Sequence, residues 1–273
     1  MSTVAFVLGG GGALGASQVG MLQALLAADI TPDLVVGTSI GAVNGAFVAA
    51  DPTAKGVAGL ELLWQHVFAS GQMDESRTRR AARFARHRTH VMSPSLIPDL
   101  VREHLEVERI EDLTVPFQCV AAQIETAASR WFTEGPVAPA VAASCAVPGL
   151  FAPVEVEGGH HYDGGLVHSI PVGRAIALGA TEIHVLQVGR VEQPLQVPTG
   201  PLAVAEVAFE IARRHRFVEE VEQVPDGIEL HVLPSGSGPI PTSAILGQSR
   251  REDPRERMRR AFTASSAYLA GRR

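Results

Sequence analysis

Hydrophobic and polar positions in the first fifty residues alternate in blocks that predict two strand–helix units. Residues 3–8 form an apolar run, rich in β-forming side chains, that ends at consecutive glycines as a buried parallel strand does. Residues 15–28 carry valine and leucine at helical spacing. The same order recurs, with a strand at 33–36 and a helix at 40–50. Strands that alternate with helices predict a parallel sheet covered by helices.

The pattern is less regular beyond residue 50. Apolar spacing predicts further helices, at residues 53–70, 95–105, about 202–224 and 254–269. Short β-rich runs predict further strands, at residues 115–124, 130–133, 153–157, 182–188 and 228–233. These elements indicate the α/β class with a mainly parallel central sheet.

The length and composition fit one globular unit. A chain of 273 residues that is 46% hydrophobic and 19% charged has ample material for a core. No internal repeat and no convincing boundary divides it. We therefore expect a single domain over residues 1–273, in which residues 189–273 form a helix-and-strand extension packed on the rest.

Charge and cysteine content narrow the function and the compartment. A formal charge of −6 gives no general attraction to nucleic acids. Cys119 and Cys145 are too few for a disulfide framework and fit a reducing compartment. The uncharged run at residues 3–28 resembles a membrane span or signal peptide, but no basic residue precedes it and glycines interrupt it. A soluble, cytoplasmic protein is expected.

One segment departs from the acidic balance, since six arginines and no acidic residue occur between Arg77 and Arg88. Phe84 is the one large apolar residue there, so the apolar face is smaller than an interfacial helix needs. We expect a solvated surface or a mobile lid, with transient contact to anionic lipid headgroups at a membrane surface as the alternative. No aromatic interleaving supports nucleic acid binding.

The first glycine loop has the spacing G-x-G-x-x-G at Gly10, Gly12 and Gly15, between a predicted strand and a predicted helix. Dinucleotide-binding folds have this pattern and also an acidic residue near the end of the second strand. Here the acidic residue of that strand, Asp33, stands at its start. The loop also lacks the lysine of a phosphate-binding P-loop. Nucleotide binding is therefore not expected.

Ser39 stands between Gly37 and Gly41 in the pattern G-x-S-x-G, where a predicted strand gives way to a helix. Such a nucleophile elbow projects the serine hydroxyl from the sheet edge. A hydroxyl that caps the following helix explains Ser39 alone equally well. The context favours catalysis, because neighbouring parallel strands would bring the glycine loop beside Ser39 and let its N–H groups bind an oxyanion.

A serine nucleophile needs a base, and the sequence offers two kinds. Asp163 follows a predicted strand and precedes a Gly-Gly turn; burial in an apolar cleft would make its carboxylate a stronger base. An aspartate in this position is otherwise most often a turn residue. The alternative is a Ser–Asp–His triad that uses one of four histidines: His168, His184, His215 or His231.

Three motifs in this order resemble the patatin-like phospholipases: "GGGALG" at residues 10–15, "GTSIGA" at 37–42 and "DGG" at 163–165. The similarity extends over about residues 4–188. It implies a three-layer α/β/α sandwich that hydrolyses acyl esters of lipids through an acyl-serine intermediate. No metal or other cofactor is implied.

By the same resemblance Ser39 would be the nucleophile and Asp163 its base, while Gly10, Gly11 and Gly12 would form the oxyanion hole. The substrate would be a lipid or another acyl ester.

Two positions depart from the family pattern. Leu14 stands where the family usually has Arg or Lys beside the oxyanion loop, and Ser169 stands where it often has Asn. Loss of the cation would weaken stabilisation of a negative transition state or change the preference for charged lipids. A non-catalytic or weakly active lipid-binding or regulatory protein of the same fold is therefore the alternative to a lipid hydrolase.

The histidines near Asp163 also suggest a metal site. His160 and His161 are adjacent, however, and neighbouring side chains point to opposite faces of a strand. No metal site is expected here.

Overall fold

The structure, a computed structural model, describes residues 2–70, 77–188, 194–195, 197–199, 201–236 and 252–272. Its central sheet has eight strands: β1 (Val4–Leu8), β2 (Leu34–Thr38), β3 (Phe117–Gln123), β4 (Ala128–Phe132), β5 (Val154–Val156), β6 (Gly159–Asp163), β7 (Glu182–Leu186) and β8 (Glu229–Val232). Neighbours in the order β3-β2-β1-β7-β8 are parallel. β4 and β6 both pair antiparallel with β3, and β5 pairs antiparallel with β6.

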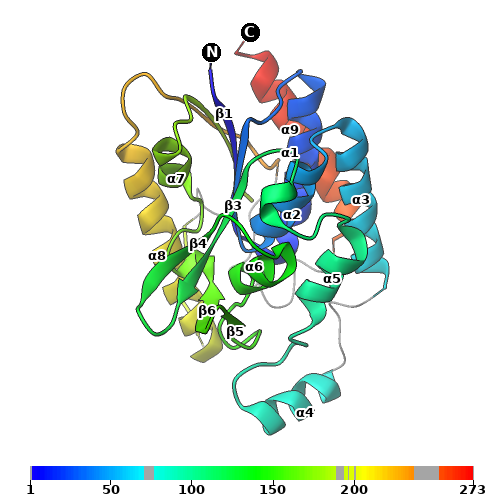
Figure 1. Ribbon diagram of the computed structural model, residues 1–273, viewed down its shortest axis with the longest axis vertical. Coiled ribbons are helices and arrows are strands. Elements are labelled where there is room, and N and C mark those ends of the chain that lie inside the picture. Colours follow the sequence, from blue (N-terminus) through cyan, green and yellow to red (C-terminus); the bar gives the residue numbers. More distant parts are fainter. Residues whose placement is uncertain are drawn as a thin grey trace.

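Helices cover both faces of this sheet (Figure 1). One face carries six helices: α1 (Ala16–Ala27), α2 (Ile40–Ala50), α3 (Ala54–Ala69), α5 (Leu96–His104), α6 (Val137–Ser144) and α9 (Pro254–Ala270). The other face carries α7 (Val172–Ala177) and α8 (Pro201–Glu222). The basic helix α4 (Arg77–His87) lies at the lower end of the molecule in Figure 1. The predicted α/β class with a mainly parallel sheet is confirmed.

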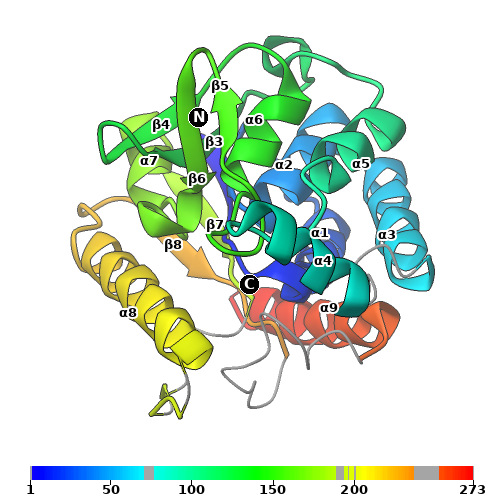
Figure 2. The ribbon, with the colours of Figure 1, turned by 90° about the horizontal axis from the view of Figure 1, so that it is seen from below.

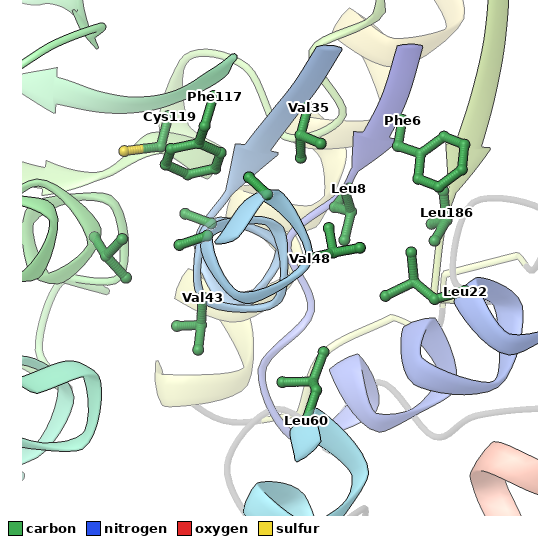
Figure 3. Packing of buried hydrophobic residues seen from close by; sticks show 14 of the residues in the cluster. Phe6, Leu8, Leu22, Val35, Val43, Val48, Leu60, Phe117, Cys119 and Leu186 are labelled. Atoms are coloured by element: carbon green, nitrogen blue, oxygen red, sulfur yellow. The ribbon is translucent and has the colours of Figure 1, made fainter. Parts of the chain in front are cut away.

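β1 is apolar throughout and its neighbour β2 nearly so, because both of their faces are buried. In β1, Phe6 and Leu8 join the core under α1 and α2, while Ala5 and Val7 join the core under α7 and α8. Figure 3 shows Phe6 and Leu8 among the side chains of the core under α1 and α2, near Leu22 of α1. Full burial of such a side chain contributes about 1.5–3 kcal/mol, so the continuous apolar runs determine the layered architecture.

Both predicted strand–helix units are present, as β1, α1, β2 and α2. The helices predicted at 53–70, 95–105 and 254–269 correspond to α3, α5 and α9. Three helices were not predicted. The segment of α4 was expected to be a solvated surface or a mobile lid. α6 consists almost entirely of small apolar residues without an amphipathic period, and α7 has only six residues. Within the described ranges, no helix combines the length and the apolar composition that crossing a bilayer requires. The uncharged run at 3–28 forms β1, the glycine loop and α1.

The C-terminal helix α9 packs directly on α1, and Gly20 lies at the contact. A Cβ atom on Gly20 would lie 2.0 Å from the carbonyl oxygen of Met258. Both helices bury apolar side chains there, including Leu22 and Met258. The contact joins the last described segment of the chain to the first helix.

We expect Gly20→Ala to destabilise the protein by about 1–3 kcal/mol, because the added methyl group forces α9 away from α1. Thermal unfolding would record a Tm lowered by several degrees. Gly59→Ala is the matched control: Gly59 is an exposed helical glycine of α3 with open space around its Cβ position. That variant should be neutral or slightly more stable. A Gly20→Ala protein as stable as the control would argue against the docking of α9.

Candidate active site

Ser39 occupies the sharp turn between β2 and α2, with φ 55° and ψ −127°. A positive φ in a residue with a side chain costs about 1–3 kcal/mol, so the surroundings must hold it. Gly41 permits the turn, since a Cβ atom there would lie 2.1 Å from the carbonyl oxygen of Leu8. The amide of Ser39 donates to the hydroxyl of Ser144 at 2.9 Å. The Ser39 hydroxyl makes no capping hydrogen bond to α2, so the helix-cap explanation is wrong.

β3 brings Ser39 and Asp163 together, because it pairs with both β2 and β6. Thr38 lies opposite Val120 in the parallel pairing, and Asp163 lies opposite Ala121 in the antiparallel pairing. Two residues that are 124 positions apart in the sequence therefore meet. The hydroxyl of Ser39 donates to Oδ2 of Asp163 at 2.6 Å.

The Asp163 carboxyl group is almost completely enclosed. It is 2% exposed, and Ser39 is 8% exposed. Burial raises the pKa of Asp163 to about 6, although hydrogen bonds from Ser39 and from the Gly165 amide, and the charge of Arg213, each oppose the shift. At neutral pH the group is thus mainly an anion and yet a much better proton acceptor than an exposed aspartate.

The glycine loop passes directly beside Ser39. A Cβ atom on Gly10 would lie 3.2 Å from Cβ of Ser39, so the close approach depends on the missing side chain. The amide of Gly10 donates to the carbonyl oxygen of Ser169 at 3.0 Å and is thus engaged. Among the described residues, the amides of Gly11 and Gly12 have no acceptor. Of the three glycines predicted to form the oxyanion hole, Gly11 and Gly12 are therefore the two whose amides are not already engaged.

The structure places Arg213 of α8, rather than residue 14, against this loop. Leu14 is 1% exposed and packs in the core. Arg213 lies 203 positions after Gly10, and its Nη2 donates to the Gly10 carbonyl oxygen at 2.8 Å. Its Nε donates to the hydroxyl of the buried Ser169. Sequence reasoning missed Arg213, because it lies within a helix that carries several basic residues and no motif.

A buried polar network holds the other side of the loop. Gln18 of α1 donates to the carbonyl oxygen of Gly9 at 2.7 Å. Asn44 of α2 donates to the carbonyl oxygen of Gly15 at 3.0 Å and to the Gln18 side chain at 2.7 Å, and it accepts from Trp64 of α3 at 2.9 Å. This network was not predicted, although Gln18 and Asn44 stand out as polar residues in largely apolar helices.

All ten histidines lie in the described part of the chain, and none is hydrogen-bonded to Ser39 or Asp163. His168 is the nearest to Asp163 in sequence among the four triad candidates, and its Nδ1 pairs with Glu220 of α8 at 2.9 Å. The geometry therefore gives no support to a Ser–Asp–His triad.

His160 and His161 lie on opposite sides of β6, the first exposed beside Glu125 and the second buried, so they do not share a ligand site. A different group of three potential metal ligands lies within 4.8 Å of one another on β7 and β8: Glu182, His184 and His231. The guanidinium of Arg272 donates to Nδ1 of His231 at 2.7 Å. A positive charge in that position opposes cation binding.

Comparison with known proteins relates most of the chain to one family. Residues 6–176 match the family described as patatin-like phospholipase. An uncharacterized NTE family protein of Mycobacterium tuberculosis is 30% identical over 187 residues, which cover 65% of this chain and 46% of that protein. A lysophospholipase of Aspergillus terreus is 32% identical over 194 residues, which cover 70% of this chain and 12% of that protein. The matches thus span about half of the mycobacterial relative and a small part of the fungal one.

The fold also resembles a solved structure. The crystal structure of VipD from Legionella pneumophila aligns with a TM-score of 0.52 and 13% sequence identity, covering 99% of this chain and 67% of that chain. At this identity the likeness concerns the fold alone.

We expect the reaction of Ser39 with a fluorophosphonate probe to depend on pH through Asp163. Only the carboxylate form accepts the Ser39 proton, so the labelling rate should rise about tenfold per pH unit below about 6 and level off above it. Labelling rates between pH 4.5 and 8.5 measure this directly. Asp163→Asn, the control, should label slowly at every pH. A rate that is flat from pH 4.5 upward would contradict the raised pKa.

Proposed function

The chain belongs to the patatin-like phospholipase family, and we propose that it is a serine acyl hydrolase that cleaves carboxylic ester bonds of lipids. The observation that carries this proposal is the 2.6 Å hydrogen bond between the Ser39 hydroxyl and the buried Asp163 carboxylate. The amides of Gly11 and Gly12 on the adjoining loop complete the proposed site.

The first half of the reaction forms an acyl-enzyme. Oγ of Ser39 attacks the ester carbonyl carbon while Oδ2 of Asp163 takes the hydroxyl proton. The carbonyl oxygen becomes an oxyanion, to which the amides of Gly11 and Gly12 donate. When the carbon–oxygen bond to the alcohol breaks, Asp163 returns its proton to the leaving alkoxide. Ser39 is then esterified and the alcohol is free.

The second half regenerates the enzyme with water. Asp163 accepts a proton from a water molecule whose oxygen attacks the acyl carbon, and the same amides stabilise the second oxyanion. The bond to Oγ breaks as Asp163 gives the proton back to Ser39, and the fatty acid leaves. A pKa near 6 suits a group that must both accept and release this proton.

An apolar groove beside the nucleophile favours a lipid as the substrate. Its walls come from α2, α3 and the start of α5, and they include Ile40, the residue that follows Ser39 in the sequence. Eight side chains line it: Ile40, Val43, Leu63, Trp64, Val67, Leu96, Ile97 and Leu100. We propose that this groove receives the acyl chain. The name of the fungal relative, a lysophospholipase, is compatible with such a substrate.

We expect Ser39→Ala and Asp163→Asn each to lower the rate of hydrolysis of p-nitrophenyl esters by about 10³-fold or more. The first variant lacks the hydroxyl that attacks the ester, and the second lacks the carboxylate that accepts the proton. Wild-type KM should fall as the acyl chain lengthens from acetate to palmitate, because each added methylene buries more apolar surface. Steady-state kinetics across the series measures both effects.

His168→Gln is the control for the triad alternative and should retain activity within about twofold. Equal loss in that variant would instead support a histidine base. A wild-type protein that binds lipid but hydrolyses no ester in the series would favour the lipid-binding or regulatory alternative.

We also propose transient contact between α4 and anionic membranes. The helix carries no acidic residue, and Arg86 and Phe84 are exposed on it, as is Arg88 just after its end. β1 runs downward in Figure 1, toward the end of the molecule where α4 lies. β2 is parallel to β1, so the carboxyl end of β2, which Ser39 follows, faces the same end. Figure 2, seen from below, has α4 in the foreground. Contact there would bring the site to a lipid surface.

The double variant Arg86→Gln/Arg88→Gln should bind anionic vesicles about 30-fold more weakly, since each surface arginine contributes about 1 kcal/mol. Sedimentation with phosphatidylserine-containing vesicles measures the change. Arg109→Gln/Arg130→Gln removes the same charge from exposed ion pairs elsewhere and should bind normally. Unchanged binding by the α4 variant would end the membrane proposal.

A further inference from the structure

We propose that Arg213 is a positioning residue for the oxyanion loop: from the C-terminal part of the chain it fixes the peptide unit that presents the Gly11 amide and supplies the positive charge beside it. The inference rests on the proposed function. No motif assigns a role to α8, and the matched family region ends at residue 176, before this helix begins.

The direction of the Gly11 amide follows from the planarity of the peptide bond. The Gly10 carbonyl and the Gly11 amide belong to one planar trans unit, so they point in opposite directions. When Nη2 of Arg213 holds the carbonyl oxygen of Gly10 at 2.8 Å, it also sets the direction of the Gly11 N–H. A charged donor on the carbonyl further polarises the peptide unit and strengthens the N–H as a donor.

Ser169 accepts hydrogen bonds from the two groups that flank this peptide unit, the Gly10 amide and the Arg213 guanidinium. Its carbonyl oxygen accepts from the amide of Gly10 at 3.0 Å, and its hydroxyl accepts from Nε of Arg213. Gly10 is therefore anchored at its amide by Ser169 and at its carbonyl by Arg213. A loop of consecutive glycines has little conformational preference of its own, so such anchors decide its shape.

The guanidinium is itself rigidly held. Its side chain is 8% exposed, and Nη1 donates to Glu210 of α8, which is 2% exposed, at 2.6 Å. Its carbon lies 5.9 Å from the ring centre of Phe209, whose ring in turn adjoins Gly165 beside the catalytic aspartate. One turn of α8 thus contacts both the glycine loop and the loop after Asp163. A buried ion pair is weak evidence for stability alone, which makes a role in the site the better explanation.

The positive charge of Arg213 also acts on the proposed base, Asp163. It favours the carboxylate of Asp163 and so opposes the rise in pKa that burial causes. The other groups that face Asp163 are the Ser39 hydroxyl, the Gly165 amide and the Cys145 thiol at the end of α6. Burial raises the pKa of Cys145 well above its ordinary value, so that thiol remains neutral. Arg213 is thus the cation that tunes Asp163 among the described residues.

The experiment compares Arg213→Gln and Arg213→Lys with the wild type by kcat, KM and the pH dependence of kcat/KM for one p-nitrophenyl ester. We expect Arg213→Gln to lower kcat about 10- to 100-fold with KM changed less than about twofold, and to move the acid limb to higher pH. Arg213→Lys keeps the charge but lacks the fork that spans two acceptors. It should keep the wild-type acid limb and recover only part of kcat.

Arg214→Gln is the matched control, since Arg214 pairs with the other oxygen of Glu210 at 3.8 Å on the same helix. It should retain wild-type kcat. Wild-type kcat and an unmoved acid limb in folded Arg213→Gln would overturn the inference. If Arg213→Gln does not fold, Arg213→Lys and Ser169→Ala decide: lowered kcat in both supports the inference, and wild-type kcat in both refutes it. An inactive wild type would overturn the proposed function itself. An active wild type with an unaffected Arg213→Gln variant would overturn only the role of Arg213.

Discussion

The hydrogen bond between the hydroxyl of Ser39 and the carboxylate of Asp163 is the interaction on which the account of this protein depends. It exists because β3 stands between β2 and β6 and fixes the register of both, so that two strand ends far apart in the sequence finish at the same place. The layered fold supplies this register. Helices pack on both faces of the central strands, and the sheet so enclosed places the two residues that make the 2.6 Å contact.

The same arrangement carries costs that the surrounding residues offset. Ser39 keeps a positive φ, a carboxyl group is buried, and a glycine loop without conformational preference must hold one shape. Ser144 holds the amide of Ser39, and Gln18 and Asn44 bind the loop from one side. The clamp proposed for Arg213 would act from the other side. The residues of the proposed site are therefore connected by hydrogen bonds to the helices that surround them.

Much of this was predictable from sequence. The apolar runs specify the first two strands, and the glycines around Ser39 mark its turn because no larger residue fits. Asp163 became a candidate because Gly164 and Gly165 follow it, a signal that is strong only together with the other motifs. What the sequence did not reveal depends on tertiary position: α6 lacks a period, and the amide of Gly10 is engaged only because the carbonyl of Ser169 reaches it. The contact of Arg213 with Gly10 could not be predicted for the same reason, since the two residues are 203 positions apart in the sequence.

A crystal structure of the protein after reaction with a fluorophosphonate would identify both the nucleophile and the oxyanion donors, because the phosphonyl group mimics the tetrahedral intermediate. We expect phosphorus to be bonded to Oγ of Ser39 and a phosphonyl oxygen to lie about 2.7–3.1 Å from the amides of Gly11 and Gly12. An adduct on another side chain, or a phosphonyl oxygen turned away from the glycine loop, would contradict it.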